Sequence, residues 1–206
     1  MNNAVPAQAD TAFLMILLCL MIVPILICIK YSRKIKSDVA SSIVKCLIFA
    51  IVTILSNGLS AFSGNETFSY IMEALYRFSF DLMLIYVLQY SQQYTRVFHE
   101  VSPFKKGCFI IAYLDGILLF LNIIFHNVFT IETVRFPNFD MYHVADKSII
   151  FYFHYVFAYG LVVCIIASFI IKIIQIPDFY RKKYLPILVL ICVITVSKFI
   201  CGISEF

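Results

Sequence analysis

Charged residues are scarce in this chain, and their scarcity excludes an ordinary water-soluble domain. Only 14% of the 206 residues are charged and 62% are hydrophobic, whereas a soluble domain carries about 25% charged residues. A surface with so few charges favours lipid as its solvent. The net charge of +4 therefore does not indicate a nucleic-acid partner, and the placement of the charges is expected to set membrane topology.

The motifs of enzyme active sites are also missing. The chain has no G-x-S-x-G, no glycine-rich phosphate loop and no paired nucleophile and base. The seven cysteines lie in or beside apolar runs without a C-x-x-C pair, which favours packing over disulfides. His126, His143, His154 and Glu73 could hold a metal, but no pair has the spacing of a metal motif. The sequence predicts no enzyme activity, no cofactor and no metal.

Six apolar runs of about 18 to 23 residues alternate with polar stretches. At about 1.5 Å rise per residue, each run can cross a hydrocarbon core of about 30 Å as a helix. The predicted fold is all-α, a polytopic transmembrane bundle of six helices that forms a single domain over residues 1–206. The helices are expected at residues 12–29, 43–62, 68–90, 108–125, 149–171 and 185–203.

Basic residues gather on every second gap between these runs. The opposite gaps hold only Arg135 and Lys147, while Arg77 and Lys198 lie inside apolar runs. By the positive-inside rule, the basic gaps are cytoplasmic and the amino terminus is outside. We expect a multi-pass protein of the cell inner (plasma) membrane. The twelve residues on the basic side are Lys30, Arg33, Lys34, Lys36, Lys45, Arg96, Lys105, Lys106, Lys172, Arg181, Lys182 and Lys183.

Ionisable residues inside the apolar runs need an explanation, because each costs about 2.5 to 3.5 kcal/mol at the centre of a membrane helix. Glu73, Arg77 and Asp81 are spaced i, i+4, i+8 and share one stripe of the third helix. They are predicted to form one intramembrane charge network. The network could fasten this helix to its neighbours or take part directly in ligand binding or signalling.

A second group of polar residues is expected in the outer half of the bundle. Asp115, Asn122 and His126 share a face of the fourth helix, with Asp115 near mid-membrane. If the polar groups of several helices face inward, they form a pocket for a small polar or anionic ligand. Interhelical hydrogen bonds explain them equally well. The predicted ligand-binding residues are Asn57, Glu73, Arg77, Asn122, His126 and His154.

The segment from His126 to Ser148 is the one sizeable stretch outside the predicted helices. It is rich in aromatic residues, with Phe129, Phe136, Phe139 and Tyr142. An aromatic segment of this length could cover the outer end of the bundle. The sequence analysis assigns it no strand or helix.

Several stretches resemble the amino-terminal seven-helix membrane input region of bacterial sensor histidine kinases and GGDEF diguanylate cyclases. The clearest is "ALYRFSFDLMLIYVLQYSQQYT" (Ala74 to Thr95), an aromatic-rich helix with a central acidic residue and a tyrosine-rich end. The others are "LLFLNIIFHNVFTIE" (Leu118 to Glu132), "FHYVFAYGLVV" (Phe153 to Val163) and "PDFYRKKYLPIL" (Pro177 to Leu188). The resemblance implies a seventh helix and a cytoplasmic output module after Phe206.

The resemblance leads to a functional expectation with one competitor. A sensory input region would detect an external or membrane cue and pass a helix rearrangement to the output module, which such proteins use as homodimers. Its other partners would be the lipid bilayer and a small ligand, and no nucleic acid is expected. The alternative is the six-helix substrate-binding membrane component of a small-molecule transporter.

Overall fold

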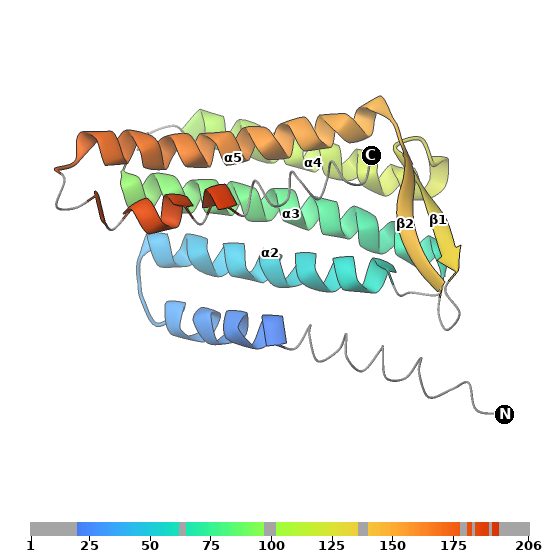
Figure 1. Cartoon of the computed structure of the whole chain (residues 1–206), viewed down its shortest axis with the longest axis horizontal. Helices are drawn as coiled ribbons and strands as arrows, with labels where there is room; N and C mark the ends of the chain where they lie inside the picture. The colour runs from blue at the N-terminus through green and yellow to red at the C-terminus, as the bar shows by residue number, and fades with distance from the viewer. Residues whose placement is uncertain are drawn as a thin grey trace.

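The chain folds as a bundle of antiparallel helices with a small β-hairpin at one end (Figure 1). The structure is a computed structural model that describes residues 20–61, 65–96, 102–135, 140–177, 181–182, 184–189 and 191–193. Four long helices form its body: α2 (Asp38–Ala61), α3 (Glu66–Thr95), α4 (Ser102–Phe125) and α5 (Ile149–Gln175). Two shorter apolar helices, Leu20–Ser32 and Tyr184–Val193, accompany them. The predicted all-α class is confirmed.

Helix ends lie where the local sequence supplies caps. The Ser37 hydroxyl accepts a hydrogen bond from the Ala40 amide at 3.1 Å, so α2 begins several residues before the predicted residue 43. The Asn65 side chain accepts from the Phe68 amide and caps α3. This helix ends at Arg96, which has a left-handed backbone with φ of 55°. The helices therefore begin at polar capping residues and are longer than the apolar runs in the sequence.

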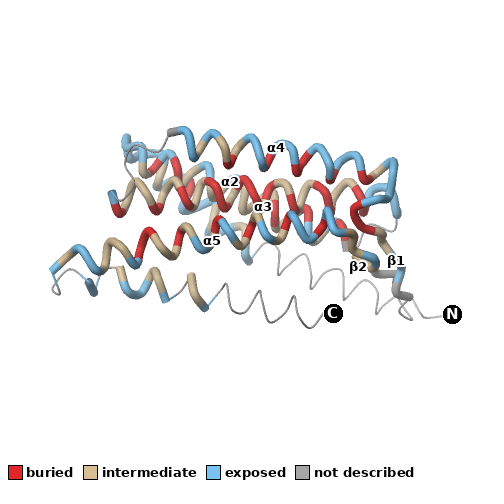
Figure 2. The backbone as a smooth tube through the Cα atoms, turned by 90° about the horizontal axis from the view of Figure 1, so that it is seen from above, coloured by how far each residue is buried: buried red, intermediate tan, exposed pale blue. Residues whose placement is uncertain are grey.

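α3 is the central helix of the bundle and packs against α2, α4 and α5. Its buried side extends over most of its 30 residues, from Ser69 to Thr95. Leu82, Ile85 and Leu88 lie in the main apolar core with buried residues of α4 and α5. In Figure 2, buried positions run along α3 while α4 turns one long face outward. Neighbours on three sides shield this helix from its surroundings.

The aromatic segment forms a β-hairpin, which the sequence analysis missed. β1 (Phe129–Arg135) pairs antiparallel with β2 (Asp140–Lys147). Phe129 and Ile131 face the bundle, while Glu132 and His143, paired across the hairpin, are more exposed. The alternation F-T-I-E-T-V was the available signal for a strand. The hairpin covers the end of the bundle, here called the hairpin end.

Three helices are long and apolar enough to cross a membrane: Asp38–Ser60 of α2, Pro103–Phe125 of α4 and Ile149–Gln175 of α5. Their outward residues include large apolar side chains such as Ile117 and Ile124 of α4 and Val163 of α5, each more than half exposed. Glu73, Arg77 and Asp81 of α3, in contrast, are buried. This inside-out distribution supports a membrane environment for the bundle.

The basic gaps gather at one end of the bundle. The turn from residue 32 to 38, the end of α3, the start of α4 and the end of α5 all lie opposite the hairpin (Figure 1). We call this the basic end. Alternating helix direction explains the pattern, because every second connection returns to the same end.

Candidate functional site

The predicted charge stripe on α3 divides into two separate clusters. Glu73 Oε1 and Arg77 Nη2 form an ion pair at 2.5 Å, and both residues are buried. Asp81 instead faces His154 of α5 and Asp115 of α4. At about 3.6 residues per turn, each step of four residues rotates a side chain by about 40°. Two steps turn Asp81 by about 80° from Glu73, which carries it toward a different pair of helices.

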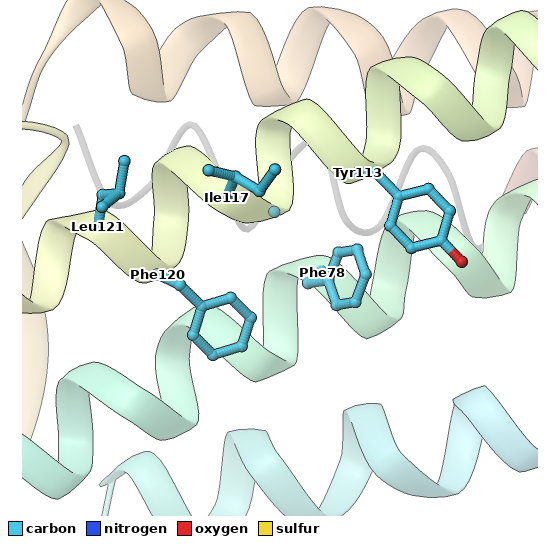
Figure 3. Close-up of a pocket in the computed structure, with 6 residues that line it drawn as sticks. Phe78, Tyr113, Ile117, Phe120 and Leu121 are labelled. Carbon is cyan, nitrogen blue, oxygen red and sulfur yellow. The ribbon is translucent and has the colours of Figure 1, made fainter.

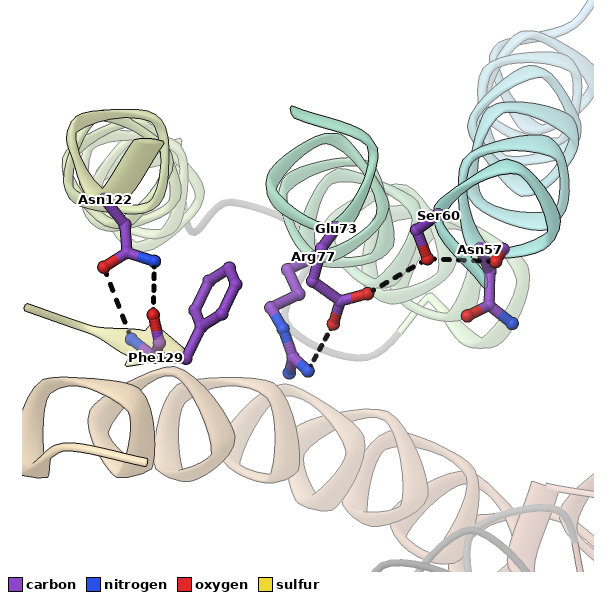
Figure 4. Close-up of polar contacts among 6 residues, drawn as sticks. All are labelled: Asn57, Ser60, Glu73, Arg77, Asn122 and Phe129. Carbon is purple, nitrogen blue, oxygen red and sulfur yellow. Dashed lines mark hydrogen bonds and ion pairs between the residues drawn. The ribbon is translucent and has the colours of Figure 1, made fainter. Parts of the chain in front are cut away.

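The first cluster is the Arg77 site, an ion pair surrounded by aromatic rings. Figure 4 shows the Glu73–Arg77 pair with Ser60 and Phe129. The guanidinium carbon lies 4.2 Å from the centre of the Phe151 ring. The ring centres of Phe129 and Tyr155 lie 5.8 Å away. On the far side, Glu73 Oε2 accepts a hydrogen bond from the Ser60 hydroxyl of α2 at 3.4 Å. Cation–π contacts and one carboxylate together replace water around the buried cation.

The second cluster, the His154 cluster, joins three helices in the interior. His154 Nδ1 lies 2.8 Å from Asp115 Oδ2 and 3.3 Å from Asp81 Oδ2. The three residues are 0% to 3% exposed. Neither oxygen of Asp81 accepts a hydrogen bond from the described residues. Two carboxylates therefore compete for one ring nitrogen, which has at most one proton to donate.

Asn122 of α4 binds the hairpin directly. Its side-chain oxygen accepts hydrogen bonds from the Val128 and Phe129 amides at 2.7 and 3.3 Å, and its NH2 group donates to the Phe129 carbonyl at 2.8 Å. Tyr70 of α3 adds a bond from the Ile131 amide to its hydroxyl oxygen at 3.0 Å. Asn122, Val128 and Phe129 are all buried. One side chain thus pairs backbone groups that would otherwise lie unpaired in an apolar interior.

The six residues of the predicted pocket do not line one cavity in the described part of the chain. Asn57 is exposed on α2, and Figure 4 shows it beyond Ser60, away from Asn122. His126 is exposed, has a φ of 49°, and lies edge-on to Tyr70 at 4.5 Å. His154 belongs to the other cluster. The rings of Phe129 and Phe151 fill the space between Asn122 and Arg77.

Two cavities in the described part of the chain are poor ligand sites. A void of about 10 Å³ beside Glu73, beneath the hairpin, has room for about one water. A larger groove of about 370 Å³ lies on the outside of α3 and α4 and is almost wholly apolar (Figure 3). Such a groove suits an acyl chain better than a polar ligand. Its lining residues are Phe78, Tyr113, Gly116, Ile117, Phe120 and Leu121.

The ionisable residues of both clusters stood out in the sequence, but which of them contact one another did not. The sequence analysis noted Asp115 as an intramembrane acid and grouped His154 with the pocket, without pairing the two. A sequence signal for this pairing existed, because single ionisable residues in separate apolar runs must each find a partner. Phe129 and Phe151 as partners of Arg77 had no such signal. Lys198, also noted in the sequence, lies outside the described residues.

The His154 cluster is the best candidate site, because a histidine and two carboxylates can share a proton or bind a cation. The Arg77 site lies beside it, since Tyr155 contacts both Arg77 and the His154 ring. Comparison with protein-family models, curated proteins and solved structures finds no match to this chain.

Proposed function

We propose that this chain is the membrane-embedded sensory input region of a bacterial signalling protein. It detects a cue from outside or from the membrane and passes a helix rearrangement to a cytoplasmic output module. The observation that carries the proposal is a continuous line of contacts from the hairpin to the interior of the bundle. The resemblance of Ala74 to Thr95 and the other quoted stretches to sensor input regions adds support.

The line of contacts begins in the hairpin and ends between three helices. Phe129 of β1 stacks near Arg77, and Arg77 in turn lies over the Phe151 ring. Phe151 and Tyr155 meet edge to face at 5.1 Å, and Tyr155 meets His154 at 5.9 Å. His154 then contacts Asp81 and Asp115. A displaced hairpin would therefore alter contacts that hold α3, α4 and α5 together.

The proposed orientation places the hairpin outside and the basic end in the cytoplasm. Its support is the number of Lys and Arg residues at the basic end, against Arg135 and Lys147 at the hairpin end. With the hairpin outside, an external cue acts where the line of contacts begins. The basic end is where a cytoplasmic module would receive the change.

Buried charges can bring two helix arrangements of such a bundle close in free energy, so that a cue can shift their populations. The attraction within a buried ion pair is largely offset by the cost of removing both charges from water. Two helix arrangements that pair these charges differently can then be close in free energy. A cue changes their populations only if it binds the two arrangements with different affinity.

The test of the proposal is whether a substitution in the hairpin changes the spacing of the helices at the basic end. Spin labels at Ser41 of α2 and Ile174 of α5, both exposed near that end, report the spacing of the helices in liposomes. The labelled chain lacks its native cysteines. Phe129→Ala, which removes the ring over Arg77, should shift or broaden the distance distribution. Glu132→Gln, an exposed change on the same strand, should leave it unchanged.

An unchanged distribution in Phe129→Ala, in a variant that keeps its fold, would contradict the coupling. The coding sequence after Phe206 separates the two functional hypotheses. A seventh helix followed by a kinase or cyclase module agrees with the sensor. A stop followed by a transporter ATPase would favour the transport component and reject the sensor.

A further inference from the structure

Asp81 is the least satisfied polar group in the described part of the bundle interior. It is 0% exposed, and both of its carboxylate oxygens lack a hydrogen-bond partner there. An uncompensated carboxylate in an apolar medium costs several kcal/mol. Oδ2 points at the shared His154 nitrogen, 3.3 Å away, so the side chain is directed into the cluster. A missing positive charge at this point would explain the arrangement.

Charge counting admits a divalent cation as well as protons. Two carboxylates with a protonated imidazole leave a net charge of about −1, which either a second proton on one carboxylate or a divalent cation in place of the imidazole proton would remove. Two carboxylates, a neutral imidazole and a divalent cation sum to zero. Among the described neighbours, Arg77 is one turn away on α3, but its charge is already paired with Glu73. It therefore leaves the cluster's charge uncompensated.

The spacing of the three donors fits a small metal ion. One ligand atom from each of Asp81, Asp115 and His154 lies within 4.8 Å of the others. In a tetrahedral zinc site, bonds of about 2.0 to 2.2 Å put neighbouring ligand atoms about 3.3 Å apart. The distance from Nδ1 to Asp81 Oδ2, 3.3 Å, matches that value, whereas Asp115 Oδ2 lies closer, at the hydrogen-bond distance of 2.8 Å. Small side-chain rotations would open the donors around an ion.

We infer that Asp81, Asp115 and His154 bind one divalent first-row transition-metal ion inside the membrane bundle. A nitrogen donor with two carboxylates suits Zn²⁺, Co²⁺, Fe²⁺ or Mn²⁺ and leaves a coordination position for water or the second Asp81 oxygen. The ion would tie α3, α4 and α5 together at the end of the line of contacts. Its part in signalling rests on the proposed function, whereas the binding itself does not.

The test uses the full chain in lipid nanodiscs, stripped of metal with a chelator and then given Zn²⁺ or Co²⁺ alone. We expect about one tightly held ion per chain by elemental analysis, and a Co²⁺ absorption spectrum of tetrahedral intensity. Exchange should be slow because the ligands are almost fully buried. Asp81→Asn, Asp115→Asn and His154→Gln should each weaken binding at least about tenfold.

A matched control separates this site from surface histidines. The double variant His126→Gln, His143→Gln removes two exposed histidines at the hairpin end and should retain the ion. Asp81→Asn keeps the side-chain volume and removes a buried charge, so its fold should persist, which near-ultraviolet circular dichroism checks. Loss of metal from the histidine double variant, with retention in the cluster variants, would overturn the inference.

A second outcome would also overturn it. If wild type binds no metal, yet its thermal stability depends on pH and Asp81→Asn abolishes that dependence, the cluster holds a proton and not a metal. Failure of the sensor proposal gives a different result. Metal would then bind as expected while Phe129→Ala leaves the distance between spin labels at Ser41 and Ile174 unchanged.

Discussion

Arg77 shows how a single cation is kept inside an apolar bundle. It has one carboxylate partner, Glu73, and four aromatic rings within 6 Å of its guanidinium carbon. Its Nε atom has no hydrogen-bond partner among the described residues. The rings supply a negative face without carrying a charge that would itself need a partner. The stability of this arrangement therefore depends on keeping Glu73 and Arg77 together.

Replacing Arg77 alone should cost more than replacing both members of the pair. Arg77→Met leaves the Glu73 carboxylate buried with only Ser60 as a partner, and we expect a loss of about 3 to 5 kcal/mol. Glu73→Gln combined with Arg77→Met should cost clearly less, because no charge stays behind. Unfolding in detergent micelles measures both. Equal losses in the two variants would contradict a coupled pair.

Asn122 presents the complementary case, in which a neutral side chain satisfies a buried backbone. Asn122→Ala leaves the Val128 and Phe129 amides without their acceptor, and an unpaired buried group costs about 1 to 3 kcal/mol. We expect lower stability and much faster hydrogen exchange at these two amides. Asn127→Ala, at an exposed neighbouring position, should change neither. Protected amides in Asn122→Ala would show that other groups hold the hairpin.

At the level of residues, the sequence predicted which ionisable side chains are buried, but not which side chains on other helices they contact. The cost of intramembrane charge was enough to select Glu73, Arg77 and Asp81 from α3. Because each four-residue step rotates the side chain around the helix, Asp81 faces Asp115 and His154 rather than Glu73 and Arg77. The i, i+4, i+8 spacing alone does not show this. Partners on other helices depend on packing angles, which one sequence does not contain.

At the scale of elements, α3 and α4 approach closely at Gly116. A Cβ atom added there would lie 2.5 Å from Cδ2 and 3.2 Å from Cγ of the Phe78 ring. The ring would have to move as a whole, since its base is also in contact. Gly116 thus lets the two helices pack with Phe78 between them.

Gly116→Ala should therefore destabilise the bundle by about 1 to 3 kcal/mol, the usual cost of overpacking. Gly160→Ala on α5 is the matched control, because nothing lies within 4 Å of a Cβ added there. In a helix it should be neutral or stabilising by up to about 1 kcal/mol. Gly116→Ala with Phe78→Leu should recover part of the loss in thermal unfolding. Similar stability of the two alanine variants would refute this account.

The hairpin marks where element prediction failed. Its strands are 7 and 8 residues long and lie between two far longer apolar runs. Alternation in β1 is clear only for Phe129, Ile131 and their outward neighbours. In β2, charged residues both precede and follow the aromatic Tyr142. Helix prediction succeeded because lipid imposes length and hydropathy on every span, whereas a hairpin on the bundle end obeys neither constraint.

For the molecule as a whole, the proposed orientation follows from the partition of basic residues. We expect Ser37→Cys and Arg96→Cys to be shielded from a membrane-impermeant maleimide added outside intact cells, and Asp146→Cys to react. This expectation rests on the positive-inside rule, by which Lys and Arg would retain the basic end in the cytoplasm. Cells made permeable serve as the control, in which all three should react. Labelling of Ser37→Cys in intact cells would reverse the topology.

The number of helices and their alternation followed from the sequence, but their different roles did not. All six apolar runs were treated alike, yet among the four long helices of the described residues only α2, α4 and α5 have the hydropathy of self-sufficient spans. α3 carries Glu66, Glu73, Arg77 and Asp81 and lies among the other three. Hydropathy counts the charges of a helix, while their cost depends on the neighbours that surround it.

The shielding of α3 has a consequence for how the chain enters the membrane during synthesis. On its own, a helix with three charges near its middle would face a penalty of several kcal/mol in lipid, only partly relieved by its apolar residues. The partners of two of those charges, His154 for Asp81 and the Phe151 ring for Arg77, lie on α5 and are synthesised later. We therefore expect α3 to enter the lipid fully only after α5 has been made, so that its insertion depends on a helix that follows it in the chain.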